Sequence, residues 1–125
     1  MHIRGIRGAT TCAADEEEAI LEATEELLRQ MADANGVESD EIAAIIFTAT
    51  QDLTAAFPAE AARRLRWNLV PLLSATEMAV SDPRAVPRCI RVLMLWNTPR
   101  SQEEVVHVYL RGAARLRPDL KERRV

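Results

Sequence analysis

Apolar side chains recur at helical spacing between residues 20 and 34, and this periodicity predicts an amphipathic helix. Asp15 and Glu18 have the spacing of a capping box, so we expect the helix to begin at Asp15. The Asn35-Gly36 pair is typical of a helix C-terminus. We therefore interpret the acidic residues on the outer side of this helix as a solvated face rather than a metal site.

Strand-like patterns occur in five further segments. Alternation or short β-branched runs predict strands over residues 2–11, 42–50, 67–73, 88–96 and 104–110. The first has a pattern compatible with an edge position, with Arg7 expected at its end, and the second is expected to be covered on both faces. In the 88–96 strand, Arg91 shares one face with Cys89, Leu93 and Leu95.

The order of these elements predicts the fold class. Phe57-Pro58 before AEAARRL predicts a second helix with proline in its first turn, so the order is β, α, β, α, β, β, β. This order indicates an α+β sheet with two helices on one face. The other face would be bare and apolar, which favours oligomerisation. A chain of 125 residues is expected to form a single domain, here 1–120, with 121–125 as a disordered tail.

Composition and charge exclude several classes of protein. The 48% of hydrophobic residues argues against long disorder, and neither a membrane span nor a signal peptide is visible, so we expect a cytoplasmic protein without membrane partners. The net charge is −3, and aromatic residues make up only 4%, which argues against nucleic-acid binding. Nearly all basic residues are arginine, which suits bidentate recognition of carboxylate, but a GC-rich genome would produce the same bias.

Covalent and metal chemistry find little support in the residue patterns. No GxSxG or Cys/His/Asn signature occurs, and no cluster with ligand spacing stands outside the acidic helix, so we expect no metal and no cofactor. Cys12 and Cys89 are widely separated and are expected to be reduced and structural. His107 alternates with valines in a strand, which favours a structural histidine over a catalytic one.

Polar residues within apolar strands are the candidate site. Burying the Arg91 charge without a partner would cost several kcal/mol, so Arg91 needs either a salt bridge, for example with Glu77, or a ligand. The residues alone leave both possibilities open. Arg91, together with Arg7, Glu77 and Tyr109, would suit the binding of a small polyanion.

Several dispersed segments resemble one known family. These are IRGIRGATT, TATQDLTAAFPAEAAR, VPLLSATEM, CIRVLM and HVYL…LRPDL, which run in order from Ile3 to about Leu120. Together they resemble the monofunctional chorismate mutase of the small trimeric bacterial type. The resemblance implies ferredoxin-like α+β subunits with a mixed sheet, assembled as a homotrimeric pseudo-α/β barrel with active sites between neighbouring subunits. It also implies the cofactor-free rearrangement of chorismate to prephenate, which leads to phenylalanine and tyrosine.

The resemblance implies a role for each matched residue. Arg91 would donate to the ether oxygen of chorismate, Glu77 would accept from the ring hydroxyl, and Arg7 and Tyr109 would bind a carboxylate. The other substrate-binding residues that it implies are Phe57, Ala59, Arg63, Leu73, Ser74, Ala75, Thr76, Leu116 and Arg117. Arg63 and Arg117 would act near the mouth of the cleft.

The match is imperfect, and it leaves rival functions. Leu73-Ser74 stands where the family often has Thr-Cys, and Glu60 stands where lysine is common. One rival is a non-catalytic anion-binding trimer, which predicts that Arg91 and Glu77 pair and leave no open cleft. A second is a trimer like the enamine/imine deaminases, whose sequence signatures are not visible.

Overall fold

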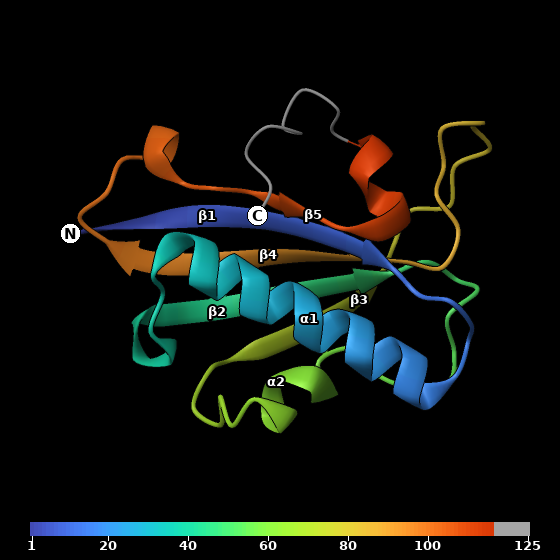
Figure 1. Ribbon diagram of the computed structural model, residues 1–125, viewed down its shortest axis with the longest axis horizontal. Helices are drawn as coiled ribbons and strands as arrows, with labels where there is room; N and C mark the ends of the chain where they lie inside the picture. The colour runs from blue at the N-terminus through green and yellow to red at the C-terminus, as the bar shows by residue number, and fades with distance from the viewer. Residues whose placement is uncertain (117–125) are drawn as a thin grey trace.

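The computed structural model describes residues 1–116, and their central element is a five-stranded mixed sheet with helices packed on it (Figure 1). The strands are β1 (His2–Thr11), β2 (Ile42–Ala49), β3 (Leu72–Thr76), β4 (Cys89–Thr98) and β5 (Val108–Tyr109). The helices are α1 (Glu17–Asn35) and α2 (Glu60–Arg64), with 3₁₀ segments η1 (Ser39–Glu41), η2 (Gln102–Glu104) and η3 (Arg111–Leu116). Across the described part, the predicted order of strands and α-helices is confirmed. Arg117 and the tail 121–125 lie outside the described residues.

The strand order is β3-β2-β4-β1-β5. β4 is antiparallel to both of its neighbours, β1 and β2, whereas the outer pairs β1–β5 and β2–β3 are parallel. β1–α1–β2 is therefore a split β–α–β unit with β4 inserted between its strands. Figure 1 shows α1 and α2 on the same side of the sheet, which confirms the predicted mixed sheet with helices on one face.

The main core lies between the sheet and α1. Ile90, Val92 and Met94 alternate along β4 and are buried, so the predicted facing of this strand is confirmed. On β1 the close approach of the helix depends on Gly8, because a Cβ there would collide with the side chain of Met31. α1 ends as predicted, with Gly36 in the left-handed region at φ 71°. No helix of the described chain combines the length and apolarity required to cross a bilayer.

The other sheet face is only partly bare, contrary to the prediction. Ala9, Cys89 and Tyr109 form a second buried cluster there with Val86 and with Ala113 of η3. The remainder of this face still exposes apolar side chains, among them those of Ile3, Leu73 and Leu93. The predicted apolar surface is therefore confined to the part of the sheet away from η3.

Two predicted strands were placed wrongly. The 67–73 segment begins as a turn, in which the Trp67 N–H donates to the Ala62 carbonyl, and the strand itself is β3 at 72–76. The 104–110 segment contributes only Val108–Tyr109 to the sheet. Just before β5, the Asn35 side chain both donates to and accepts from the Val106 backbone, at 2.9 and 2.8 Å. A side-chain amide thus satisfies the backbone groups that a neighbouring strand would otherwise pair.

Two further predictions about the N-terminal region were wrong. β1 is an interior strand between β4 and β5, and Arg7 lies in its middle rather than at its end. α1 begins at Glu17, and Asp15 does not cap it. The Asp15 carboxylate instead accepts hydrogen bonds from the backbone N–H and hydroxyl of Thr54 and from the Ala55 N–H, each at 2.9 Å. The Asp15 side chain therefore makes a tertiary contact in place of the helix cap that its local sequence spacing predicts.

Candidate active site

One row of paired residues crosses the sheet on the side away from the helices. The pairings join Ala75 to Thr48, Thr48 to Arg91, Arg91 to Ala9 and Ala9 to Tyr109. Directly paired residues share a face, so these five side chains lie on one level of the sheet, one from each strand. We call this set the Arg91 row.

Arg91 has a charged partner at the end of β3. Its Nε lies 3.3 Å from Oε2 of Glu77, the ion pair that one interpretation of the sequence requires. The Thr48 hydroxyl donates to the same Oε2 at 2.9 Å, and the Glu77 N–H donates to the Ala49 carbonyl at 2.9 Å. The Arg91 side chain nevertheless keeps 50% of its surface exposed. Glu77 is thus fixed from two sides, while Arg91 remains accessible to a ligand.

Arg7 and Tyr109 lie on the same face. Arg7 follows the alternation of β1 two residues before Ala9, and it is exposed. Its backbone N–H donates to Nδ1 of the buried His107 at 2.9 Å. This bond requires an unprotonated Nδ1, so His107 supports the strand that carries Arg7. Tyr109 is 6% exposed within the second cluster.

A second group of predicted residues lines a hollow on the helix side, with a cavity volume of about 1090 Å³. The N-terminal part of α1, the segment from Ala49 to Pro58, α2 and the end of β3 form its walls. The predicted residues that line it are Phe57, Arg63, Ser74, Ala75 and Thr76. Ala59 is partly buried at the start of α2, whereas Leu73 points to the opposite face and is 62% exposed.

Charges in this hollow are already partly paired. Arg63 Nη1 lies 2.7 Å from Glu60 Oε1, so the residue that departs from the family pattern partners a predicted substrate-binding arginine. Arg64, on the neighbouring position of α2, turns toward α1 and contacts Glu18 and Glu25. Phe57 is 70% exposed at the rim. The hollow therefore offers the Phe57 ring and Arg63 to a ligand, since Arg64, which also lines it, is held by two glutamates of α1.

The two groups share only Ala75, which belongs to the Arg91 row and also lines the hollow. Arg91, Glu77, Arg7 and Tyr109 do not line the hollow, although β2 carries Thr48 of the row directly before Ala49 of the hollow. Both groups thus lie near the same end of the sheet but on its two faces. Leu116 packs beside the second cluster in η3, and Arg117 lies outside the described residues.

Nucleophilic chemistry is disfavoured by the state of the thiols. Burial raises the pKa of Cys89 to about 11, against a smaller opposing effect of Arg91, and burial also raises the pKa of Cys12. Both cysteines are free and buried, which disfavours a role as nucleophiles. Within the described range, no three His, Cys, Asp or Glu residues are grouped as a metal site would require.

Three residues that hold the surroundings of the Arg91 row and the hollow were not predicted as such. Thr48 could have been found from the predicted 42–50 strand, but only once its register against Arg91 was known. Asp15 was assigned to the helix cap, and Arg64 is one of two adjacent arginines that sequence spacing does not distinguish.

The site presents an accessible arginine, paired with a carboxylate, on an open sheet face of an α+β fold. Such an arrangement suits a protein that binds a small anion and stabilises its charge without covalent chemistry. The comparisons with known proteins are consistent with this class. The family model of chorismate mutase type I matches residues 3–120. The chain belongs to this family. Because chorismate mutases are isomerases, the protein is an isomerase.

Relatives and solved structures agree with the family. Chorismate mutase AroH of Thermus thermophilus is 60% identical over 120 residues, which cover 95% of this chain and 97% of that protein. The AroH protein of Bacillus subtilis (strain 168) is 43% identical over 121 residues, 96% of this chain and 94% of the relative. A solved chorismate mutase from Clostridium thermocellum superposes with a TM-score of 0.84 at 46% identity, covering 87% of this chain and 96% of that one.

Proposed function

We propose that the protein rearranges chorismate to prephenate in clefts formed between neighbouring copies of the chain. The family match over residues 3–120 supports the reaction. The assembly we propose is a homotrimer of ferredoxin-like subunits arranged as a pseudo-α/β barrel, in the cytoplasm. Each cleft would combine the Arg91 row of one subunit with the hollow of its neighbour.

The observation that carries the shared cleft is the separation of the two groups on opposite sheet faces. A small substrate cannot contact side chains on both faces of one sheet at once, because the hydrogen-bonded backbone of the strands lies between the two faces. A neighbouring subunit would bring the missing half. The exposed Leu73 and Leu93, which lie beside the Arg91 row on the helix-free face, would be buried in such an interface.

The reaction is a single pericyclic shift, so the protein needs to select a compact conformer and to stabilise separating charge. Arg91 would donate to the ether oxygen as its bond to the ring breaks. Its guanidinium is held before substrate arrives, by Glu77, which is itself held by Thr48. Glu77 would accept from the ring hydroxyl and face the positive charge that develops on the ring. The donors are therefore in place at no reorganisation cost during the reaction.

The remaining predicted residues would bind the substrate. Arg7 and Tyr109 would hold the carboxylate of the enolpyruvyl side chain, and Arg63 would attract the dianion from the neighbour's hollow. Phe57 would cover the ring from the rim. Arg117 would add a further contact near the cleft mouth, and its replacement should mainly raise KM.

A second candidate is a non-catalytic trimer that binds a small anion. The Arg91–Glu77 ion pair favours it, since that interpretation predicts the pair. The same interpretation also predicts that the pair leaves no open cleft, and the half-exposed Arg91 side chain argues against this.

The loss of chorismate absorbance, measured with metal-free protein and with prephenate identified as product, separates the two candidates. Turnover without added cofactor supports the mutase. A folded trimer that binds chorismate without converting it would establish the anion-binding protein instead.

A further inference from the structure

α2 has few means of holding its own orientation. It spans five residues, Glu60–Arg64, which is too short for a helix to be stable alone. Its buried side chains are those of Ala61 and Ala62, which are too small to fix the rotation of the helix by packing. Leu65 and Trp67, just after α2, pack partly buried against the core, while the directional contacts between α2 and α1 are polar.

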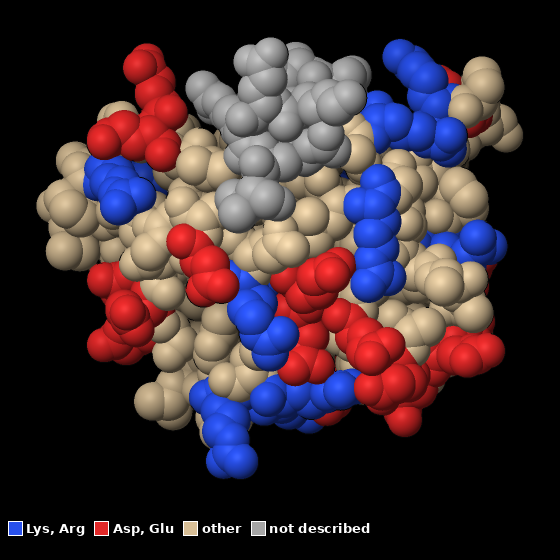
Figure 2. All heavy atoms as spheres, in the orientation of Figure 1, with Lys and Arg blue, Asp and Glu red and all other residues tan. Residues whose placement is uncertain are grey.

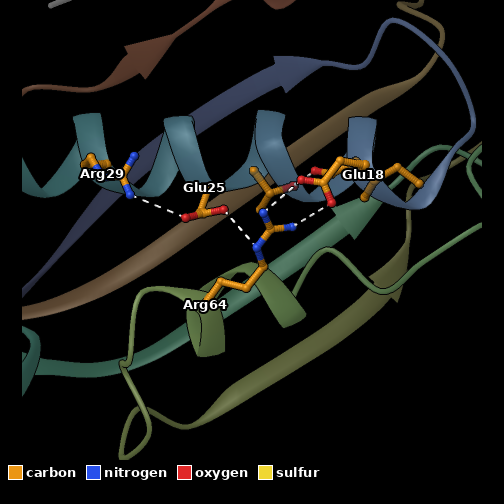
Figure 3. Close-up of polar contacts among 6 residues, drawn as sticks. Glu18, Glu25, Arg29 and Arg64 are labelled. Atoms are coloured by element: carbon orange, nitrogen blue, oxygen red, sulfur yellow. Dashed lines mark hydrogen bonds and ion pairs between the residues drawn. The ribbon is translucent and has the colours of Figure 1, made fainter.

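Arg64 supplies these contacts at the C-terminal end of α2 (Figure 3). Its Nη1 and Nη2 donate to the two carboxylate oxygens of Glu18, at 3.2 and 2.9 Å, and its Nε lies 3.1 Å from Oε2 of Glu25. Glu18 and Glu25 are seven residues apart and thus share one face of α1. The hydrogen bonds from Arg64 lower the pKa of Glu18, so the pair is charged over a wide pH range. One fork-shaped guanidinium thus bridges two turns of the helix.

Asp15 supplies a matching contact at the other end of the segment. Its carboxylate accepts three hydrogen bonds from Thr54 and Ala55, just before α2. The segment from Thr54 to Arg64 is therefore tied at one end to the loop before α1 and at the other end to α1 itself. Between the two ties it carries Phe57 and Arg63, which line the hollow.

We propose that Arg64 is a positioning residue, which with Asp15 holds Arg63 and Phe57 at the substrate hollow. This inference rests on the proposed function. Arg64 stands in the wall of the hollow, but its guanidinium is bonded to Glu18 and Glu25 of α1, whereas Arg63 stands on the neighbouring helix position with 68% of its side chain exposed. Loss of Arg64 frees α2 to rotate, which misplaces the arginine that attracts substrate.

The surface around α1 provides a matched control. Figure 2 shows acidic side chains interleaved with basic ones over this side of the molecule. Arg29 lies in the same network, 3.4 Å from Oε1 of Glu25, but it contacts α1 alone. R29Q and R64Q remove the same charge from the same face. A general effect of charge on the dianion would alter KM similarly in both variants, whereas positioning affects R64Q alone.

The experiment compares steady-state chorismate kinetics of wild type, R64Q, R29Q, R63Q and the double variant R63Q/R64Q. We expect R64Q to raise KM about fivefold to twentyfold with kcat within about twofold, the split expected when binding alone is lost. R29Q should leave both constants unchanged. In the R63Q background, R64Q should raise KM less than it does in wild type, because the part of its effect that passes through Arg63 is already lost. R64K, which keeps the charge but loses the fork, should recover part of the loss.

E18Q provides a second route if R64Q folds poorly, since Glu18 is exposed on α1 and its replacement should raise KM in the same direction. Unchanged KM in both R64Q and E18Q, with active wild type, overturns the positioning role alone. Equal effects of R64Q in the wild-type and R63Q backgrounds also overturn it. A wild type that folds but does not convert chorismate overturns the proposed function and this role with it.

Discussion

Replacing Arg91 by glutamine should separate transition-state stabilisation from folding. The variant keeps a polar side chain of similar reach but removes the charge and the fork that would face the breaking ether bond. Loss of one preorganised donor costs about 10² to 10³ in kcat, or roughly 2.7 to 4 kcal/mol. We therefore expect kcat of R91Q to fall at least about 100-fold, with a smaller change in KM.

The structure limits how much of this loss could come from stability. The Arg91–Glu77 pair spans 3.3 Å, but the two side chains are 50% and 23% exposed. Pairs this accessible contribute about 0.2 to 1 kcal/mol. Urea unfolding of R91Q should accordingly show a decrease of at most about 1 kcal/mol in the free energy of unfolding. The catalytic loss is thus several times larger than any loss of stability.

The assay is kcat from the decrease of chorismate absorbance at saturating substrate, with R84Q as the control. Arg84 is 90% exposed and pairs with Asp82 at 2.8 Å, so its replacement removes the same charge away from the Arg91 row. R84Q should retain wild-type kcat. A kcat for R91Q within about tenfold of wild type would refute the role assigned to Arg91.

Three further changes test the surroundings of the site. T48V removes the 2.9 Å hydrogen bond to Glu77 and should lower kcat about fivefold, the effect of about 1 kcal/mol, while T48S retains it; equal kcat in the two variants would contradict this. E60Q frees the exposed Arg63 and should lower KM about twofold to fivefold; an increased KM would show that the pair aids binding. The hydrogen bonds to Asp15 hold its pKa below the ordinary 3.8, so its ionised form stabilises the fold above that pH. D15N should therefore have a lower Tm than wild type at pH 7, and the difference should shrink as the pH falls from 3.8 through the lowered pKa; a constant difference would exclude the linkage.

Alternation predicted the central part of the fold because a buried face imposes it directly. Every second residue of the 88–96 strand is buried, so the pattern fixed both the strand and the side to which Arg91 points. Where side chains replaced backbone partners, the pattern failed. Val105 is buried as a strand residue would be, but the backbone groups of the next residue, Val106, bond to the Asn35 side chain. Asp15 likewise stands at the spacing of a helix cap, but its carboxylate bonds to Thr54 and Ala55 instead. Sequence spacing alone does not show which of these two interactions forms.

The candidate site was predicted as a set of residues but not as an arrangement. Arg91 and Glu77 were expected either to pair or to bind a ligand, and the structure shows the pair with Arg91 still accessible. The division into two faces could not be predicted, because it depends on register among five strands and on β3 beginning at Leu72. Thr48 shows the same dependence, since it becomes a site residue only through its pairing opposite Arg91.

The central claim is that two chains build each site, and subunit complementation tests it most directly. R91Q damages the row and R63Q damages the hollow, so chains of the two kinds are co-expressed with different tags and mixed oligomers are purified. If each site combines the row of one chain with the hollow of the next, about one site in three is intact in every mixed trimer. The account predicts a kcat/KM of about a third of the wild-type value at low substrate. A value equal to the mean of the two parent variants would mean that each site lies within one chain and would contradict it.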